Sequence, residues 1–156
     1  MEESEAKRLS LELMKMSKAA YLTTIDPNGF PHTRAMINLR NEDQKPHLIS
    51  LFRDHQKDYL IIFSTNTSST KVKHVKYNPK VSVYYCRPEK WQGVMFGGEI
   101  EIVLDVELKR AIWEYGMERY YPSGYDDPDH TILRLRPLMV KGWDGEKFTT
   151  FAFKIS

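Results

Sequence analysis

Apolar residues along the chain recur with two different spacings, which predict where helices and strands form. Between positions 3 and 18 they fall three and four apart with charged residues between them, a pattern typical of a helix with one buried face. The positions expected to be buried there are Ala6, Leu9, Leu13 and Met16. Similar spacing predicts helices over 68–77 and 106–114, the second capped by Asp105. At 47–58 the pattern fits either a short helix or an irregular crossing.

Short alternating or continuous apolar runs predict the strands. They cover 19–25, 31–40, 59–65, 81–86, 91–104, 132–138, 139–143 and 147–154. Asp26-Pro27-Asn28-Gly29 and Asp144-Gly145 are turn sequences that favour antiparallel hairpins. Gly97-Gly98 interrupts the longest strand and indicates a bulge or a close backbone approach. Many strands, few helices and short turns predict one mainly β domain over 1–156, a small antiparallel barrel with helices on its outside.

The strand over 31–40 carries two arginines. Its apolar residues Ala35, Ile37 and Leu39 alternate with Arg34 and Arg40, so both arginines are expected on the face opposite the apolar one. An arginine on one face of a strand is usually an exposed charge. Such an arginine becomes a candidate ligand-binding residue only where a phosphate site lies nearby.

The chemistry of the chain changes abruptly after the apolar run 59–63. Every residue from Ser64 to Thr70 is small and polar, Lys71 follows, and a helical pattern then begins. The free N–H groups and the dipole at a helix N-terminus favour an anion, and hydroxyls and a lysine add donors and charge. This segment therefore predicts a phosphate site. The alternative is that Ser68 or Ser69 only caps the helix while Lys71 is an exposed surface residue.

Composition narrows the class of protein. Apolar residues make up 41% of the 156, which argues against disorder, and 23 basic against 21 acidic residues give no reason to expect a nucleic-acid or membrane partner. The single cysteine, Cys86, has no partner for a disulfide, which indicates a reducing compartment such as the cytoplasm. The charged first residues do not resemble a signal peptide, and no apolar run is long enough to span a membrane.

The usual catalytic motifs are missing from the sequence. It has no GxSxG, HExxH, GxGxxG or Walker-type loop, and its five histidines are scattered. Asp126, Asp127, Asp129 and His130 are better interpreted as a turn around Pro128 than as metal ligands. The aromatic run Tyr115, Tyr120, Tyr121 and Tyr125 shapes either a substrate pocket or an ordered surface loop. No acid–base pair for catalysis is predicted.

Several short motifs occur in an order that matches a known family. They are Asn28-Gly29-Phe30-Pro31 before Arg34-Ala35-Met36, Phe63-Ser64-Thr65-Asn66 with Ser69 and Lys71, Asn78-Pro79-Lys80-Val81-Ser82-Val83, Gly98-Glu99-Ile100-Glu101, and Leu135-Arg136-Pro137 with Trp143-Asp144-Gly145. Through them the chain resembles the pyridoxamine 5′-phosphate oxidase-like flavoproteins, and most of all their general stress protein branch. The resemblance implies the FMN-binding split-barrel fold and a homodimer with two flavin sites at its interface.

The resemblance also implies roles for individual residues. Arg34 and Lys71 match the cations that hold the FMN phosphate, and Thr65 and Ser69 match the hydroxyls that assist them. The segments that pass along the flavin match Ala35, Met36, Ile37, Asn38, Phe63 and Ser64. Trp91 or Gln92, in uncertain register, and Trp143 match residues that approach the ring from the partner subunit.

Two departures from the family pattern bear on the substrate. Thr70 stands where pyridoxamine oxidases have a second cation, and the run 147–151 lacks the arginine and histidine that hold their substrate phosphate. We therefore expect an FMN-dependent oxidoreductase acting on an unidentified, less charged small molecule rather than on pyridoxamine phosphate. The alternatives are a flavin carrier or stress protein without turnover, and a relative that binds a deazaflavin or haem.

Overall fold

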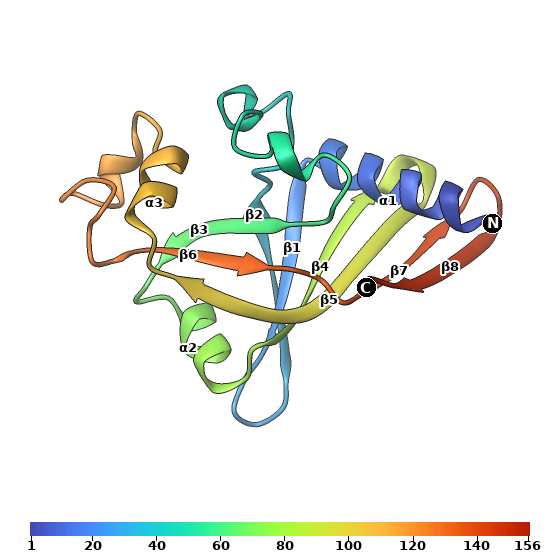
Figure 1. The fold of residues 1–156 in the computed structure, drawn as a ribbon. Coiled ribbons are helices and arrows are strands. Elements are labelled where there is room, and N and C mark those ends of the chain that lie inside the picture. Colours follow the sequence, from blue (N-terminus) through green and yellow to red (C-terminus); the bar gives the residue numbers. More distant parts are fainter.

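The computed structural model describes residues 1–156 and is built around one antiparallel sheet of eight strands (Figure 1). The strands are β1 (Ala19–Ile25), β2 (Pro31–Ile37), β3 (Ile61–Asn66), β4 (Lys80–Arg87), β5 (Gln92–Val103), β6 (His130–Leu135), β7 (Met139–Asp144) and β8 (Thr149–Lys154). The α-helices are α1 (Glu3–Met16), α2 (Thr70–Tyr77) and α3 (Val106–Ile112). Short 3₁₀ turns occupy Pro46–Leu48, Arg53–His55, Pro88–Lys90 and Met117–Arg119. The predicted alternation of helices and strands is confirmed along the whole chain.

The long strand β5 curls the sheet into a half-barrel. The strands lie in the order β2-β1-β4-β5-β6-β3, and β7 with β8 continues from the first half of β5. On one edge of β5, residues 92–97 pair with β7 and residues 100–103 pair with β6. Gly97 and Gly98 lie where the partner changes, and a Cβ on either would come within 3.1 Å of Met139 or Leu135. The predicted close approach at these glycines, and the antiparallel split barrel, are both confirmed.

Two hydrophobic cores fill the fold. The larger, of 20 buried residues, lies under α1, and the smaller, of eight, lies between β3, β6, α3 and the 39–52 segment. Ala6, Leu9 and Leu13 face the larger core as predicted, but Met16 is 58% exposed and Met14 is buried instead. The chain leaves the helix at Ser17, so the last turn does not continue the buried stripe.

Strand β2 differs most from the sequence prediction. Its faces are the reverse of those predicted, since Ala35 and Ile37 are exposed whereas Arg34 and Met36 are partly buried. The strand ends at Ile37, and Asn41 then donates a backbone hydrogen bond to Asn38 across a turn. Ile37 is 65% exposed, whereas Arg40 is buried and donates to the carbonyls of Leu60 at 2.7 Å and His55 at 2.9 Å. The interpretation of Arg40 as an exposed charge was wrong, because carbonyl oxygens compensate its burial.

Two segments that the sequence predicted as loops or left ambiguous lack long helices and strands. The 47–58 segment is an irregular crossing with 3₁₀ turns rather than a helix, and the 118–129 segment is a series of turns. Asp105 caps α3 as predicted, accepting from the backbone N–H groups of Glu107 and Leu108. None of the helices combines the length and the hydropathy that a bilayer crossing requires.

Candidate functional site

The candidate phosphate site lies where the two outer strands of the half-barrel approach each other. Arg34 projects from β2, Thr65 from β3, and Lys71 from the first turn of α2. The Lys71 Nζ donates to Thr65 Oγ1 at 3.0 Å, and Arg34 donates to Thr24 Oγ1 at 2.7 Å and to the Leu22 carbonyl at 3.3 Å. Residues from distant parts of the sequence thus meet at the α2 N-terminus.

The two cations of this site have no carboxylate partner. Burial alone lowers the pKa of Arg34. Burial lowers the pKa of Lys71 as well, and the positive charge of Arg34 lowers it further, which shows that the two side chains are close. Two half-buried like charges that no acid offsets favour a bound anion, because a phosphate would supply the missing compensation.

Ser69 supplies a second, independent indication of a ligand. It is the N-cap residue of α2, yet its hydroxyl makes no capping hydrogen bond. Its Oγ is the one buried side-chain polar atom of the structure without a hydrogen-bond partner. A buried hydroxyl left unpaired costs free energy, so such atoms in native proteins usually have a partner that the chain alone does not supply. The sequence alternative, in which the serine only caps the helix, does not describe this hydroxyl.

The loop before α2 is held in shape by Asp129, a residue that the sequence analysis placed only in a turn. Its carboxylate accepts from Asn66 Nδ2 at 2.7 Å and from the Ser68 backbone N–H at 2.8 Å, and its carbonyl accepts from the Thr67 N–H at 2.7 Å. The bond from Asn66, followed by those from the backbone and side chain of Ser68, lowers the pKa of the Asp129 carboxyl group. No local sequence signal indicates this pairing, since it joins segments about sixty residues apart.

Arg34 is oriented from behind by a buried pair that the sequence analysis also missed. Thr24 Oγ1, which accepts from Arg34, lies 2.8 Å from His74 Nδ1, and both Thr24 and His74 are buried. Burial lowers the pKa of His74, as do His32 and Arg34. When His74 is neutral with its proton on Nε2, its Nδ1 accepts a hydrogen bond from the Thr24 hydroxyl, and the Thr24 oxygen is left to accept from Arg34.

The residues expected along the flavin have different environments. Ala35 and Ile37 are exposed on β2, and Met36 packs partly against the larger core. Phe63 is buried in that core, so only its backbone is available to a ligand. Asn38 is also buried, and its amide donates to the carbonyls of Met14 and Ser17. Thr70, at the first position of α2, is exposed, and Ser64 on β3 is half-buried.

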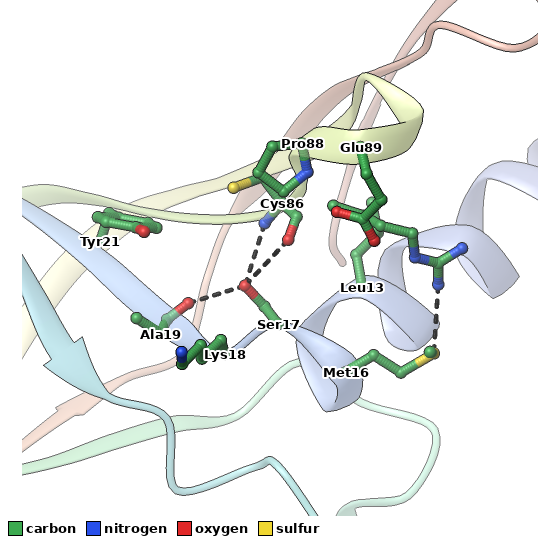
Figure 2. Close-up of a pocket in the computed structure, with 10 residues that line it drawn as sticks. Leu13, Met16, Ser17, Lys18, Ala19, Tyr21, Cys86, Pro88 and Glu89 are labelled. Carbon is green, nitrogen blue, oxygen red and sulfur yellow. Dashed lines mark hydrogen bonds between the residues drawn. The ribbon is translucent and has the colours of Figure 1, made fainter.

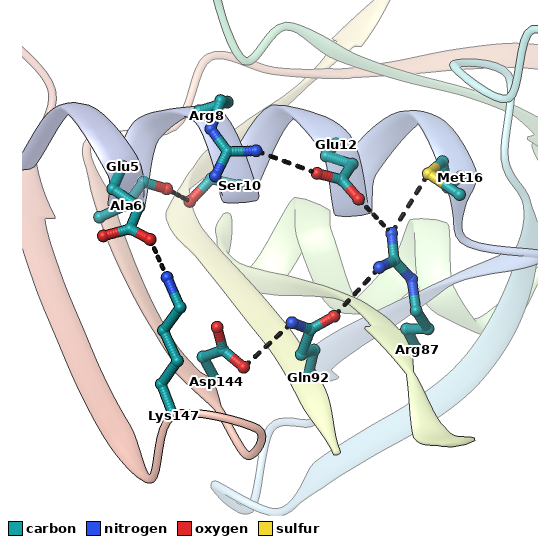
Figure 3. Close-up of polar contacts among 10 residues, drawn as sticks. All are labelled: Glu5, Ala6, Arg8, Ser10, Glu12, Met16, Arg87, Gln92, Asp144 and Lys147. Atoms are coloured by element: carbon teal, nitrogen blue, oxygen red, sulfur yellow. Dashed lines mark hydrogen bonds and ion pairs between the residues drawn. The ribbon is translucent and has the colours of Figure 1, made fainter. Parts of the chain in front are cut away.

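Trp91, Gln92 and Trp143 lie at the far end of β4 from α2. Gln92 pairs with Arg87, seven strand steps or roughly 23 Å beyond Lys80. The Gln92 amide is used within the chain, donating to Asp144 at 3.0 Å and accepting from Arg87 at 3.2 Å (Figure 3). Trp91 is 77% exposed. One chain therefore does not bring these residues to its own phosphate site.

Trp143 belongs to an aromatic row across the open face of the sheet. Its ring stacks on Tyr84 at 5.3 Å, and Tyr84 lies 6.4 Å from Tyr21. The Tyr84 ring packs directly over Gly93. A Cβ atom at position 93 would clash with the phenol oxygen of Tyr84, so this packing requires glycine there. Trp143, Met139 and Ile37 leave apolar surface exposed on β7 and β2.

One of the cavities of the structure is unrelated to the phosphate site. It has a volume of about 330 Å³ and lies between the end of α1, the start of β1 and the end of β4 (Figure 2). Its Ser17 hydroxyl is already bonded to Ala19 and Cys86. Burial raises the pKa of Cys86, so the thiol is less reactive than a free one.

Comparison with known proteins agrees with this architecture. A protein related to general stress protein 26 of the pyridoxine phosphate oxidase family, from Clostridium acetobutylicum, is 30% identical with a TM-score of 0.75, over 99% of this chain and 97% of that one. General stress protein 26 from Bacillus anthracis is 16% identical with a TM-score of 0.67, over 96% and 99%. A heme binding protein from Mycobacterium smegmatis is 14% identical with a TM-score of 0.66, over 96% of this chain but 57% of its own.

No curated protein shows a significant match to the chain. The family model described as pyridoxamine 5′-phosphate oxidase matches residues 9–144, which is most of the sequence. That match includes the β2 arginine, the β3–α2 loop and Trp143, the segments from which the resemblance was first inferred. The chain belongs to the pyridoxamine 5′-phosphate oxidase family.

Proposed function

We propose that this protein binds FMN through residues 1–156 as a single domain and acts as an oxidoreductase on a small molecule. The observation that carries the proposal is the unpaired Ser69 hydroxyl at the N-terminus of α2, the helix whose first turn also carries Lys71, together with two cations that no carboxylate offsets. A phosphate accepts hydrogen bonds from all of these groups at once. Proteins of this family usually bind a flavin, which agrees with this choice of ligand.

The residues present fit FMN at both its charged and its flat end. Arg34, Thr65, Ser69 and Lys71 would hold the phosphate. From Arg34 to Ile37 strand β2 advances three residues, roughly 10 Å, a span comparable to a ligand with a phosphate at one end and a ring system at the other. Since the side chains of Arg34 and Ile37 point to opposite faces of the strand, such a ligand would follow the β2 backbone. When bound, FMN supplies the electron transfer, so the absence of a catalytic acid–base pair is consistent with the proposal.

We also propose that two copies associate through the open face of the sheet. This face carries the Tyr21–Tyr84–Trp143 row and the exposed Ile37 and Met139. Since Trp91, Gln92 and Trp143 lie far from the phosphate site of their own chain, a partner subunit is needed to bring them to a ring. Dimers are common in the family. We place the dimer in the cytoplasm, on the ground of its single reduced cysteine.

The histidines favour flavin over haem. His74 and His130 are buried and hydrogen-bonded, and His32, His47 and His55 each pair with a carboxylate. A haem ligated by histidine would have to use one of these side chains that already have partners, whereas a flavin phosphate needs none of them. A deazaflavin shares the phosphate and remains an outcome of the test.

The test is the visible absorption of the purified protein before and after addition of FMN, with riboflavin as the matched ligand without phosphate. We expect FMN to bind more tightly than riboflavin, and its bands to bleach with NADPH or NADH and recover in air. Bands that no donor bleaches would indicate a carrier. Failure to bind FMN would refute the proposal, and binding of a deazaflavin in its place would identify the alternative cofactor.

A further inference from the structure

A second cavity adjoins the candidate flavin site and is not used by the phosphate. It has a volume of about 130 Å³ and lies between β2, β3 and the segment that follows α3. Most of its walls are apolar. They are formed by Ile37, Leu39, Ile112, Met117, Tyr120 and Tyr121. Leu39 and Ile112 belong to the smaller hydrophobic core, so the floor of the cavity is fixed rather than mobile surface. An apolar cavity of about 150 Å³ can hold one benzene ring, which sets the size of the expected ligand.

The polar group that faces this cavity from β3 is Ser64. Its Oγ lies 2.8 Å from His130 Nε2, and His130 Nδ1 lies 2.6 Å from the carbonyl oxygen of Tyr125. A carbonyl only accepts, so Nδ1 carries the histidine proton and Nε2 has the lone pair. His130 is completely buried between the rings of Tyr121 and Trp113, and burial lowers its pKa, which favours the neutral form.

This chain of bonds fixes the polarity of Ser64. Since His130 Nε2 must accept, the serine hydroxyl donates its proton inward, away from the cavity. Its oxygen is then left as an acceptor beside the hydroxyl of Tyr121, whose pKa burial raises and Ser64 lowers. A ligand donor can therefore bind the Ser64 oxygen in competition with Tyr121. Lys45 and Glu114, which also line the cavity, neutralise each other at 2.9 Å, and Glu114 also pairs with His47. The cavity offers no unpaired charge.

We propose that this cavity binds an uncharged molecule with a single ring and one hydrogen-bond donor, such as a phenol, and that Ser64 is its specificity-determining residue. Because Ile37 and Ser64 are also expected along the flavin, the ligand is the substrate class of the proposed oxidoreductase. This second statement rests on the proposed function, whereas binding of the ring does not.

The test uses phenol and toluene as probes of the whole protein, with ¹³C-labelled isoleucine and methionine methyl groups observed by NMR. We expect phenol to shift the methyl signals of Ile112 and Met117 saturably at millimolar concentrations. Toluene, which has a methyl group in place of the hydroxyl, should bind about two- to tenfold more weakly, the usual value of one net hydrogen bond. Equal affinities for the two probes, or no saturable shift from either, would overturn the proposal.

Two variants keep the test decisive, and a thermal melt of each verifies folding. Ser64→Ala should abolish the preference for phenol and keep the binding of toluene. Met117→Phe should fill the cavity and abolish both. Phenol that still shifts the Ile112 methyl in a folded Met117→Phe variant would place its binding elsewhere and contradict the assignment.

Adding FMN separates this proposal from the proposed function. If FMN displaces phenol from Ile112 and Met117, the cavity is part of the flavin site and the proposal of a separate ligand is wrong. If phenol binds and FMN does not, the proposed ligand of the cavity is supported and the proposed FMN-dependent function is wrong. If FMN binds and phenol does not, only the cavity proposal fails.

Discussion

The phosphate end and the ring end of the candidate site differ in how the chain builds them. The phosphate end is assembled within one chain, from β2, β3 and the first turn of α2, where Lys71 donates to Thr65 and the charge of Arg34 acts on Lys71. At the ring end, the amide of Gln92 is bonded within its own chain, and Trp91 and Trp143 lie far from α2. A compact anion needs few donors and local segments can supply them, whereas a flat ring needs two opposed surfaces.

The strongest way to separate the two ends is to disrupt the open sheet face. Ile37→Glu places a carboxylate where we expect a partner subunit to bury a side chain that is 65% exposed in one chain. An unpaired buried carboxylate costs about 3 kcal/mol or more, so sedimentation should show monomers at micromolar concentration. FMN binding should fall as well, but because Ile37 is itself expected along the flavin, the sedimentation result alone tests the interface.

Leu104→Glu is the matched control, because Leu104 is 77% exposed but lies after β5, away from the open face. It should leave the dimer intact. An Ile37→Glu protein that still sediments as a dimer would contradict the proposed interface.

Removing one cation tests the phosphate end alone. Lys71→Ala or Arg34→Ala should weaken FMN binding by about 1–3 kcal/mol, the value of a charge-assisted hydrogen bond, without changing the oligomeric state. Riboflavin affinity should not change, because riboflavin has no phosphate. Titration of flavin fluorescence measures both. Lys73→Ala, an exposed lysine on the same helix, is the control. Equal losses for FMN and riboflavin would argue against the phosphate assignment.

Ser69→Ala should weaken FMN binding less than the loss of a cation does, and it should not lower the stability of the unliganded protein. Removing the unpaired hydroxyl should leave the unliganded protein as stable or slightly more stable, while FMN binding weakens by about 1 kcal/mol. Urea unfolding and flavin titration give the two values. Ser68→Ala, at the exposed neighbouring position, should change neither. Clear destabilisation of the unliganded Ser69→Ala protein would mean that the hydroxyl has a partner.

The smallest expected effect is a pH dependence of stability from the pair behind Arg34. Burial lowers the pKa of His74 in the folded protein, so around and below about pH 6.5 the unfolded chain binds more protons than the folded one. The free energy of unfolding therefore decreases as the pH is lowered through this range. His74→Asn should flatten that slope between pH 7.5 and 5.5 in urea titrations. Part of the slope should persist, because burial also lowers the pKa of His130. An unchanged slope would mean that His74 is protonated in the folded protein.

Local pattern predicted much of the fold and half of the site. Turn residues, strand alternation and the Asp105 cap depend on neighbours in the sequence, and these predictions agree with the structure. The polar run ending at Lys71 likewise indicated an anion site, because a helix N-terminus and its donors are contiguous. Met16 and Arg40 were misplaced because each lies where an element ends, and a periodic pattern does not show where the chain turns away.

By itself, then, the sequence determined the half-barrel, its motifs and the residue types that we propose for binding a phosphate. The tertiary structure alone decided which side chains are free and which are bonded. Asp129 shaping the β3–α2 loop, Thr24 and His74 orienting Arg34, and His130 fixing the polarity of Ser64 all pair residues far apart in sequence. Hydrogen-bond saturation depends on distance and direction between such residues, which no spacing along the chain contains.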